Sequence, residues 1–268
     1  MDFKGKCAVV TGGSGGIGRE TSLAFAKAGA KLVIVDVNGE AAKAVAEEIK
    51  SMGGEAIAIA ADVTKSSDVQ NYVKQAVDTF GTIDLFFNNA GIEGNLTPLV
   101  DYDEDLFDQV MAVNVRGVFL GLKYVLPVMV SKGSGAVVNT ASVAGLVGTP
   151  NMSTYCASKH AVLGIVRSVS GEVARSGVRV NAVCPGPVQT RMIEDVARKI
   201  SPDDPEGVKA RYEAAIPSGR YSTAEEIANV VLFLCSDASA NVTGMHFTID
   251  GGRTATGGAV TNVTKTTN

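Results

Sequence analysis

The stretch Thr11-Gly-Gly-Ser-Gly-Gly-Ile-Gly18 joins an apolar run at residues 8–11 to a helix-period segment at 17–28. Glycines let a backbone turn tightly and approach a ligand without a Cβ clash. A helix that begins directly after such a turn offers free amides and the positive end of its dipole to a pyrophosphate. The spacing Gly12-xxx-Gly16-x-Gly18 follows a strand and opens a helix, so it favours nucleotide binding over a plain tight turn.

Apolar runs alternate with helix-period segments along nearly the whole chain. The runs are short and almost continuous in apolar residues, which is typical of parallel strands covered on both faces. Expected strands are residues 8–11, 31–36, 56–61, 83–88, 136–140, 178–183 and 246–250, and expected helices are residues 17–28, 40–52, 67–80, 102–129, 154–175 and 224–234. This α/β pattern predicts a single doubly wound Rossmann fold with a seven-stranded parallel sheet and right-handed crossovers.

Two segments fall outside the alternation. Residues 187–217 carry weak helical signal between prolines, with Ser201-Pro-Asp-Asp-Pro205 as a turn, and they predict a substrate lid inserted over the ligand cleft. Residues 253–268 form a polar tail rich in Thr and Gly, which we expect to be disordered or to lie across a neighbouring subunit. No linker interrupts the rest, so residues 1–252 are expected to form one catalytic domain.

Composition narrows the class of protein. The 268 residues, 46% of them hydrophobic and 19% charged, suit a sizeable globular core, and the net charge of −4 gives no electrostatic case for nucleic acid or an anionic membrane. No apolar run reaches the roughly 20 residues of a membrane span, and no signal pattern opens the chain. The cysteines Cys7, Cys156, Cys184 and Cys235 lack metal-ligand spacing. They predict free thiols in a reducing cytoplasm and no metal site.

Asp36 ends the second expected strand, eighteen residues past Gly18. A carboxylate at this position can accept both adenosine ribose hydroxyls and repels a 2′-phosphate. Its neighbours Val35 and Val37 supply no cation, and Arg19 lies one turn into the helix as a weaker candidate for a phosphate contact. The sequence therefore favours NAD over NADP, although Asp36 could instead cap the next helix or be solvated.

Other polar residues stand near the carboxyl ends of the expected strands. Asp62 could accept from the adenine amino group or cap the following helix, and both can hold. Asn88 is as well suited to tying strands together as to contacting a cofactor. Asn114 lies within an apolar helix, where its amide needs a partner such as a water at a kink or another core group. Thr190 could hold the nicotinamide amide or a phosphate, or could simply begin a loop.

Ser153-Thr-Tyr-Cys-Ala-Ser-Lys159 places Tyr155 and Lys159 four residues apart, on one face of an expected helix. A phenol has a pKa of about 10 in water. An ammonium beside it should lower that pKa, which would make Tyr155 a usable general acid–base near neutrality. Such a pair alone also occurs on ordinary surface helices. Ser142 ends the fifth expected strand and either donates to a carbonyl oxygen alongside Tyr155 or is a turn serine.

The motifs occur together in the order and spacing of one family. They are Thr11-Gly-xxx-Gly16-x-Gly18, Asp62, Asn88-Asn-Ala-Gly91, Asn114, Ser142, Tyr155-xxx-Lys159, Asn181, Pro185-Gly186 and Thr190. Over about residues 5–252 the chain resembles the short-chain dehydrogenase/reductase family. The resemblance implies that Tyr155 is the catalytic acid–base and that Lys159 binds the nicotinamide ribose and lowers the Tyr155 pKa. It also implies that Ser142 orients the substrate carbonyl and that Asn114 holds a water in a proton relay to Lys159.

The same resemblance implies a cofactor site and an assembly. The residues expected to bind NAD are Gly12, Ser14, Gly16, Ile17, Gly18, Asp36, Asp62, Val63, Asn89, Ala90, Gly91, Tyr155, Lys159, Pro185, Gly186, Val188 and Thr190. Members are mostly homotetramers, with residues 102–129 and 154–175 expected at the interface. The implied activity is reversible NAD(H)-dependent hydride transfer between a secondary alcohol and a ketone.

The substrate is expected to be a small cyclic or compact, mostly uncharged carbonyl compound. Residues 85–94, 115–122 and 138–143 resemble NAD-dependent reductases of cyclic ketones. The candidate substrate-pocket residues are Glu93, Val143, Thr149, Asn151, Met152, Pro187, Met192 and Ile193. Two alternatives remain open from the sequence, a regulator that senses NAD without turnover and an NAD-dependent epimerase or dehydratase that shares the Tyr-xxx-Lys pair.

Overall fold

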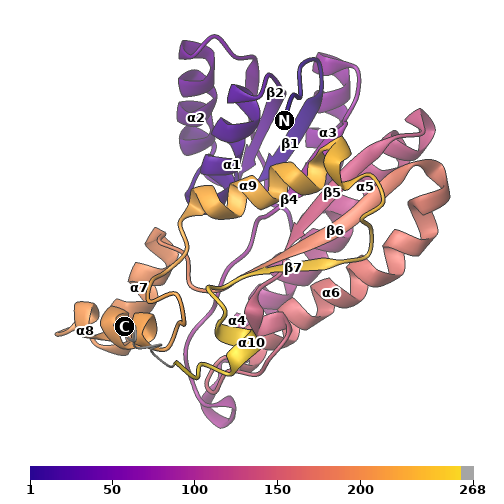
Figure 1. The fold of residues 1–268 in the computed structure, drawn as a ribbon. Coiled ribbons are helices and arrows are strands. Elements are labelled where there is room, and N and C mark those ends of the chain that lie inside the picture. The colour runs from indigo at the N-terminus through magenta and orange to yellow at the C-terminus, as the bar shows by residue number, and fades with distance from the viewer. Residues whose placement is uncertain (261–268) are drawn as a thin grey trace, which may run out of the picture.

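A seven-stranded parallel sheet forms the centre of the computed structural model, which describes residues 1–260 (Figure 1). The strands are β1 Cys7–Thr11, β2 Lys31–Asp36, β3 Ala56–Ala60, β4 Leu85–Asn88, β5 Gly135–Thr140, β6 Val178–Pro185 and β7 His246–Ile249. Their order is β3-β2-β1-β4-β5-β6-β7. Strands are added outward from β1 in one direction up to β3 and in the other direction from β4 on, so the strand order switches between β1 and β4. The predicted doubly wound Rossmann fold is confirmed. Ligands of such sheets bind where the strand order switches, at the carboxyl ends.

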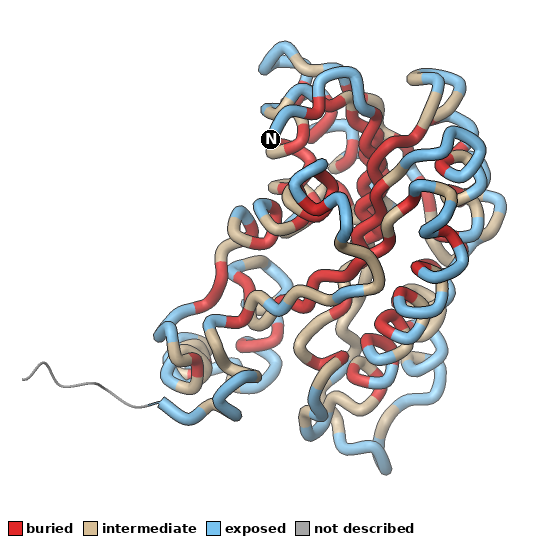
Figure 2. Tube along the Cα trace, turned by 45° about the vertical axis from the view of Figure 1, so that its right-hand side comes forward, coloured by how far each residue is buried: buried red, intermediate tan, exposed pale blue. Residues whose placement is uncertain are grey.

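Helices cover both faces of the sheet. On one face lie α1 Gly16–Lys27, α2 Gly39–Ser51 and α9 Ala224–Cys235, and on the other lie α3 Ser66–Phe80, α5 Gly117–Lys132 and α6 Ser153–Val173. Alternate strand residues serve the two layers: Cys7 and Val9 pack toward α3, α5 and α6, while Ala8 and Val10 pack toward α1, α2 and α9. The central strands β1, β2, β4, β5 and β6 are consequently buried on both sides (Figure 2), as their apolar runs predicted, whereas the edge strands β3 and β7 are partly exposed.

Buried asparagine amides cross the middle of the sheet. The Asn88 amide donates to the Asn139 side chain at 3.1 Å, and the Asn139 amide donates to the Asn181 carbonyl at 3.1 Å. Asn181 continues the series, since its amide donates to the Val242 carbonyl at 2.8 Å. All three side chains are almost fully buried. Asn88 therefore has the structural role that the sequence left open, because a buried amide must find partners.

The single helix expected at residues 102–129 is wrong in detail. The structure has a 3-10 turn at Leu99–Asp101, then α4 Glu104–Met111, a π-helical turn at Ala112–Arg116 and α5. The π turn contains Asn114, whose side chain bonds both backbone groups of Ile92 at 2.8 Å. A contact with a residue 22 positions away thus accompanies the change in helical pitch, and π turns of this kind are frequent at functional sites.

Residues Glu104–Lys132 also bear on the membrane expectation. By length and composition this helical stretch is apolar enough to cross a membrane, contrary to what the sequence reading expected, and 44% of its most apolar window is buried. Core helices of sheet proteins share these properties. Here α5 packs against α3, α6 and the strands of the sheet, which accounts for its apolar character.

The segment outside the alternation is helical. It contains α7 Arg191–Ile200 and α8 Pro205–Ala214, which lie together beside the body of the molecule in Figure 1. The expected polar tail begins with a short helical turn, α10 Arg253–Thr256, and residues 261–268 lie outside the described part of the chain. The remaining short elements are 3-10 turns at Val143–Gly145, Ala174–Ser176 and Asp237–Ser239.

Candidate active site

A cavity of about 840 Å³ opens at the carboxyl ends of the central strands. It is lined by the Gly-rich turn, by the residues that follow β2, β4, β5 and β6, by the start of α6 and by α7. Of the residues predicted for the cofactor and for catalysis, all line this cavity except Gly18 and Asn114. One cavity therefore collects motifs that are spread over 180 residues of sequence.

The Gly-rich turn presents unpaired amides to the cavity. Gly15 is the N-cap of α1, no side chain caps this helix, and its first turn carries no acidic residue. Gly16 has a φ of 49°, and a Cβ there would lie 3.3 Å from Thr190. Gly18 has a different task from the one predicted, because a Cβ there would clash with the Gly12 carbonyl. Its hydrogen lets α1 pack directly on the turn. The cradle fits a pyrophosphate.

Asp36 lines the cavity at the end of β2, where it contacts the Gly-rich turn. Its carboxylate accepts from the Ser14 hydroxyl at 2.7 Å, from the Ser14 amide at 3.2 Å and from the Asn38 amide at 3.0 Å. Serine and backbone donors can be exchanged for ribose hydroxyls, so the geometry is compatible with the predicted ribose contact. Asp36 does not act as the helix cap of α2, since Asn38 fills that position.

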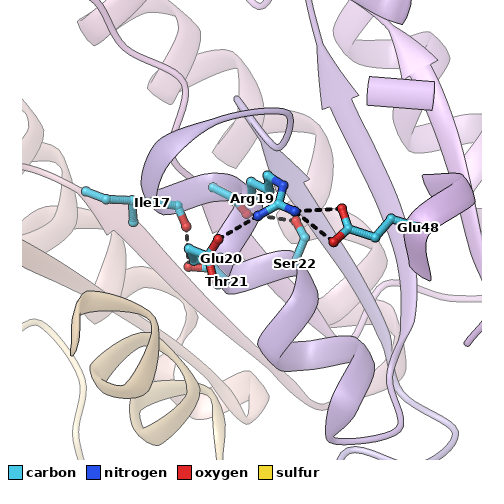
Figure 3. Close-up of polar contacts among 7 residues, drawn as sticks. Ile17, Arg19, Glu20, Thr21, Ser22 and Glu48 are labelled. Atoms are coloured by element: carbon cyan, nitrogen blue, oxygen red, sulfur yellow. Dashed lines mark hydrogen bonds and ion pairs between the residues drawn. The ribbon is translucent and has the colours of Figure 1, made fainter. Parts of the chain in front are cut away.

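Arg19 is turned away from this site. Its guanidinium donates to both Glu48 carboxylate oxygens at 2.7 Å and to Glu20 at 2.7 Å (Figure 3). It does not line the cavity. A 2′-phosphate beside Asp36 would therefore meet a carboxylate, while the nearest sequence candidate for a cation is already paired with α2.

Side chains that follow β3 and β4 form hydrogen bonds that order the wall of the cavity. Asn89 donates to the Thr11 carbonyl at 3.1 Å and accepts from the Thr140 hydroxyl at 3.0 Å, which ties three strand ends to one another. Asp62 accepts from the Thr64 amide at 3.0 Å and hydroxyl at 2.7 Å. These bonds help to keep the pKa of the Asp62 carboxyl below its usual range, against the effect of burial. The helix cap of α3 is Lys65, so Asp62 orders a turn and does not cap the helix.

Tyr155, Lys159 and Ser142 meet at the other end of the cavity. Tyr155 and Lys159 lie one turn apart on α6, and the Lys159 ammonium is 5.6 Å from the centre of the Tyr155 ring. The Lys159 Nζ donates to the Thr140 carbonyl at 2.9 Å, which anchors it to the end of β5. Ser142 accepts from the Ala144 amide at 3.1 Å, and its side chain lies near enough to Tyr155 to act on the pKa of the phenol. This arrangement can transfer a proton and donate a hydrogen bond to the same oxygen atom.

The predicted lowering of the Tyr155 pKa is not found in this structure. Burial raises the pKa of Tyr155 above its ordinary 10, Glu93 raises it further, and the hydrogen bond from Ser142 opposes the rise only in part. Burial also lowers the pKa of Lys159 to about 8. The sequence correctly placed the ammonium one turn away, but burial of the phenol acts in the opposite direction to the predicted lowering.

Asn114 supports the site from behind. Besides Ile92, its amide reaches the Ser158 hydroxyl at 3.0 Å, and the side chain is fully buried. A Cβ on Gly91 would lie 3.2 Å from the Asn114 oxygen and 3.4 Å from the Lys159 nitrogen, so both approach the same backbone. These bonds give the buried Asn114 amide the core partners that the sequence analysis expected it to need. The Asn114 side chain does not line the cavity.

The substrate end of the cavity contains the predicted residues with one exception. Asn151 does not line it, and its backbone, at a φ of 65°, accepts from the Thr97 amide instead. The lining residues that the sequence did not predict include Gln109 on α4, Val196 on α7, Tyr212 on α8 and Arg253 on α10. The Arg253 guanidinium lies 5.7 Å from the Tyr212 ring centre. No motif marks them, because each reaches the cavity only through tertiary packing.

Glu93 is a further acidic group within electrostatic reach of Tyr155. Burial raises the pKa of its carboxyl to about 7, and the cation of Lys199 on α7 opposes that rise. Among residues 1–260 no hydrogen bond or ion pair to this carboxyl is formed. The sequence placed Glu93 in the pocket but gave no signal that its carboxyl would be left without a partner.

A family model described as "Enoyl-(Acyl carrier protein) reductase" matches residues 12–254. Levodione reductase from Leifsonia aquatica is 43% identical over 256 residues, covering 94% of this chain and 96% of that protein. The chain belongs to the short-chain dehydrogenase/reductase family. Cyclohexanol dehydrogenase from Acinetobacter sp. (strain SE19) is 39% identical, with 94% of this chain and 96% of that protein covered.

Solved structures agree. A crystal structure of levodione reductase superposes with a TM-score of 0.93 at 42% identity, covering 94% of this chain and 99% of that one. NAD⁺-bound xylitol dehydrogenase follows at a TM-score of 0.89 and 37% identity, with 94% and 100% covered. This short-chain dehydrogenase/reductase is therefore an enzyme, an oxidoreductase that interconverts alcohols and ketones with a nicotinamide cofactor. The alternatives of a sensor without turnover and of an epimerase or dehydratase find no support in these relatives.

Proposed function

We propose that the chain oxidises a small cyclic secondary alcohol, or reduces the matching ketone, with NAD in preference to NADP. The observation that carries this proposal is the single cavity with Asp36 and the Gly-rich turn in one part and Tyr155, Ser142 and Lys159 in another. Residues predicted separately from the sequence as cofactor-binding and catalytic thus face one continuous space.

The residues that would hold the cofactor follow from this wall. The amides at the start of α1 would bind the pyrophosphate, Asp36 the adenosine ribose, and Lys159 the nicotinamide ribose. A bound nicotinamide ring supplies or accepts the hydride. In the direction of reduction Tyr155 gives its hydroxyl proton to the carbonyl oxygen, and Ser142 donates a hydrogen bond to the same oxygen as negative charge develops there.

Protonation states suit this direction near neutral pH. Burial keeps Tyr155 protonated, so it is ready to act as the acid. In the direction of oxidation Tyr155 must lose its proton, and an oxidised nicotinamide ring carries a positive charge that favours the phenolate. The pKa of Lys159 is lowered to about 8, so its ammonium can exchange protons near neutral pH. Lys159 would thereby restore the protonation state of Tyr155 after each turnover.

The lining at the substrate end supports a compact, mostly uncharged substrate. Val143, Met152, Ile193 and Val196 supply apolar surface around the reacting position. Pockets of this kind bind by apolar contact and use a few polar groups for orientation. Levodione reductase and cyclohexanol dehydrogenase carry the names of cyclic compounds, which agrees with this class.

Tyr155→Phe tests the proposal. We expect the variant to lose turnover by roughly 10²–10⁴-fold, because the general acid is gone, while it binds NAD within about twofold of the parent. NADH absorbance with a panel of cyclic and open-chain secondary alcohols measures turnover, and calorimetric titration measures NAD binding. Turnover close to that of the parent would contradict the assignment of Tyr155, and no turnover of any alcohol by the parent would contradict the substrate class.

We further propose that copies of the chain assemble, with α4, α5 and α6 at the contact, as a homotetramer. Phe107 and Phe119 are 42% and 50% exposed on these helices, and a partner would cover them. Light scattering after size-exclusion chromatography gives the mass directly. We also propose that residues 1–252 form one catalytic domain with residues 187–217 as its substrate lid, and that the enzyme works in the cytoplasm, where its four free, buried cysteines would stay reduced.

A further inference from the structure

Residues 92–95 form a wall segment beside the cavity, of which Ile92 and Glu93 line the cavity itself. Asn114 holds both backbone groups of Ile92 at 2.8 Å. Gly94, with a φ of 80°, lies against the Tyr102 hydroxyl, which leaves no room for a side chain. The backbone on either side of Glu93 is therefore fixed from behind by two different elements, so the carbonyl of Gly94 has a defined position at the edge of the cavity.

The α7 helix faces this wall. Met192, Ile193 and Val196 line the cavity, so the apolar side of α7 forms part of the substrate chamber. The polar side is turned outward, and Arg198 there is paired within the helix, with Asp195 at 2.7 Å and Glu194 at 3.5 Å. These intrahelical pairs stabilise α7 itself but do not fix its place relative to the sheet.

Lys199 is different from its neighbour. Its Nζ donates to the Gly94 carbonyl at 3.2 Å and lies 3.5 Å from the Asn95 side-chain oxygen, across 105 and 104 residues of sequence. Within residues 1–260, these are the side-chain hydrogen bonds that connect α7 with the wall at 92–95. The ammonium is also placed where it acts on the Glu93 carboxyl, which gives the contact a second, electrostatic component.

We propose that Lys199 is a positioning residue that latches α7 over the substrate chamber through the carbonyl of Gly94. The latch holds the apolar side of α7 against a bound substrate without touching the reacting atoms. Loss of the latch should weaken substrate binding and leave the chemistry at Tyr155 in place. Because lid opening often limits product release, kcat should stay the same or rise.

Three variants test the latch. Lys199→Met removes the charge and the donor while keeping an apolar stem, Lys199→Arg keeps both, and Arg198→Met removes a neighbouring cation whose partners lie within α7. For Lys199→Met we expect KM for the alcohol to rise roughly three- to tenfold, because one charged hydrogen bond at an exposed position is lost, with kcat unchanged or higher. Lys199→Arg and Arg198→Met should stay within about twofold of the parent in both quantities.

Hydrogen–deuterium exchange gives a readout that does not depend on activity. The amides of residues 191–200 should exchange roughly three- to tenfold faster in Lys199→Met than in Arg198→Met, while those of α6 should not change. Equal KM and equal exchange in the two methionine variants would overturn the latch. The inference rests on the proposed function only for its kinetic part. If the parent turns over no alcohol, the proposed function fails, and the exchange comparison alone still decides the latch.

Discussion

Replacing Glu93 with glutamine should remove the loss of folding stability that the parent protein suffers when the Glu93 carboxyl must ionise in a partly buried position as pH rises. The ordinary pKa of this carboxyl is 4.5, and burial raises it to about 7 in the folded protein. Between these values the folded state binds a proton that the unfolded state has lost, so the stability of the parent falls as pH rises through this window. Glutamine does not titrate, so the variant should not show that fall.

The size of the effect follows from the displacement of the pKa from 4.5 to about 7. Each pH unit corresponds to about 1.4 kcal/mol, which sets a ceiling of about 3 kcal/mol. Glu93 is only partly shielded from water, so we expect about 2 kcal/mol. The unfolding entropy of a 268-residue chain is about 0.56 kcal/mol/K, which converts this free energy into about 4 °C in Tm.

Differential scanning fluorimetry of both proteins from pH 4.5 to 8 measures the effect. The Tm difference between Glu93→Gln and the parent should grow by about 4 °C over this range in favour of the variant. Glu225→Gln, at an exposed position in the first turn of α9, serves as the control and should show no such growth above pH 5. A Tm difference for Glu93→Gln that stays constant across the whole range would refute the reasoning.

Three further changes probe the cofactor end and the core. Asp36→Ala should weaken NAD binding and reduce the NAD-over-NADP preference in kcat/KM by roughly tenfold or more, since a charged acceptor is worth about 1.5–3 kcal/mol; an unchanged ratio would remove Asp36 from cofactor selection. Gly18→Ala forces a Cβ into the Gly12 carbonyl and should lower Tm by several degrees, whereas a Cβ on Gly15 meets nothing within 4 Å, so a comparable loss in Gly15→Ala would contradict the packing argument. Asp84→Asn removes a carboxylate that is 4% exposed, accepts from the Cys7 amide at 2.8 Å and forms ion pairs with Lys6 and Lys132, and it should cost about 2 kcal/mol in urea unfolding; a cost under about 0.5 kcal/mol would show that these ion pairs contribute nothing.

Much of the fold could be predicted from local pattern because both faces of the sheet are covered. Continuous apolar runs marked all seven strands, and errors were confined to their ends. β4 was expected from residue 83 but starts at Leu85, since Asp84 turns its carboxylate toward the Cys7 amide. The π turn at Asn114 could not be predicted locally, because its partner Ile92 lies 22 residues away.

The site divides in the same way. Motif spacing brought Tyr155, Lys159 and Ser142 to the carboxyl edge of the sheet, where the structure has them. The predicted lowering of the Tyr155 pKa was wrong, because a sequence shows which cation is adjacent but not that the fold buries part of the phenol, which raises its pKa. Tyr212 and Arg253 were missed since they come from the inserted helices and the end of the chain, where no pattern indicates proximity to Tyr155.

The buried amides of Asn88, Asn139 and Asn181 have a consequence for how this protein tolerates change. The Asn88 amide donates to the Asn139 side-chain oxygen, and the Asn139 amide donates to the backbone carbonyl of Asn181. An apolar replacement of Asn139 therefore leaves both the Asn88 amide and the Asn181 backbone carbonyl without these partners. Substitutions at Asn88 and Asn139 should therefore be epistatic, with the double replacement less harmful than the two single effects combined. Because these buried bonds connect neighbouring strands, the first substitution among them determines which later substitutions the sheet tolerates.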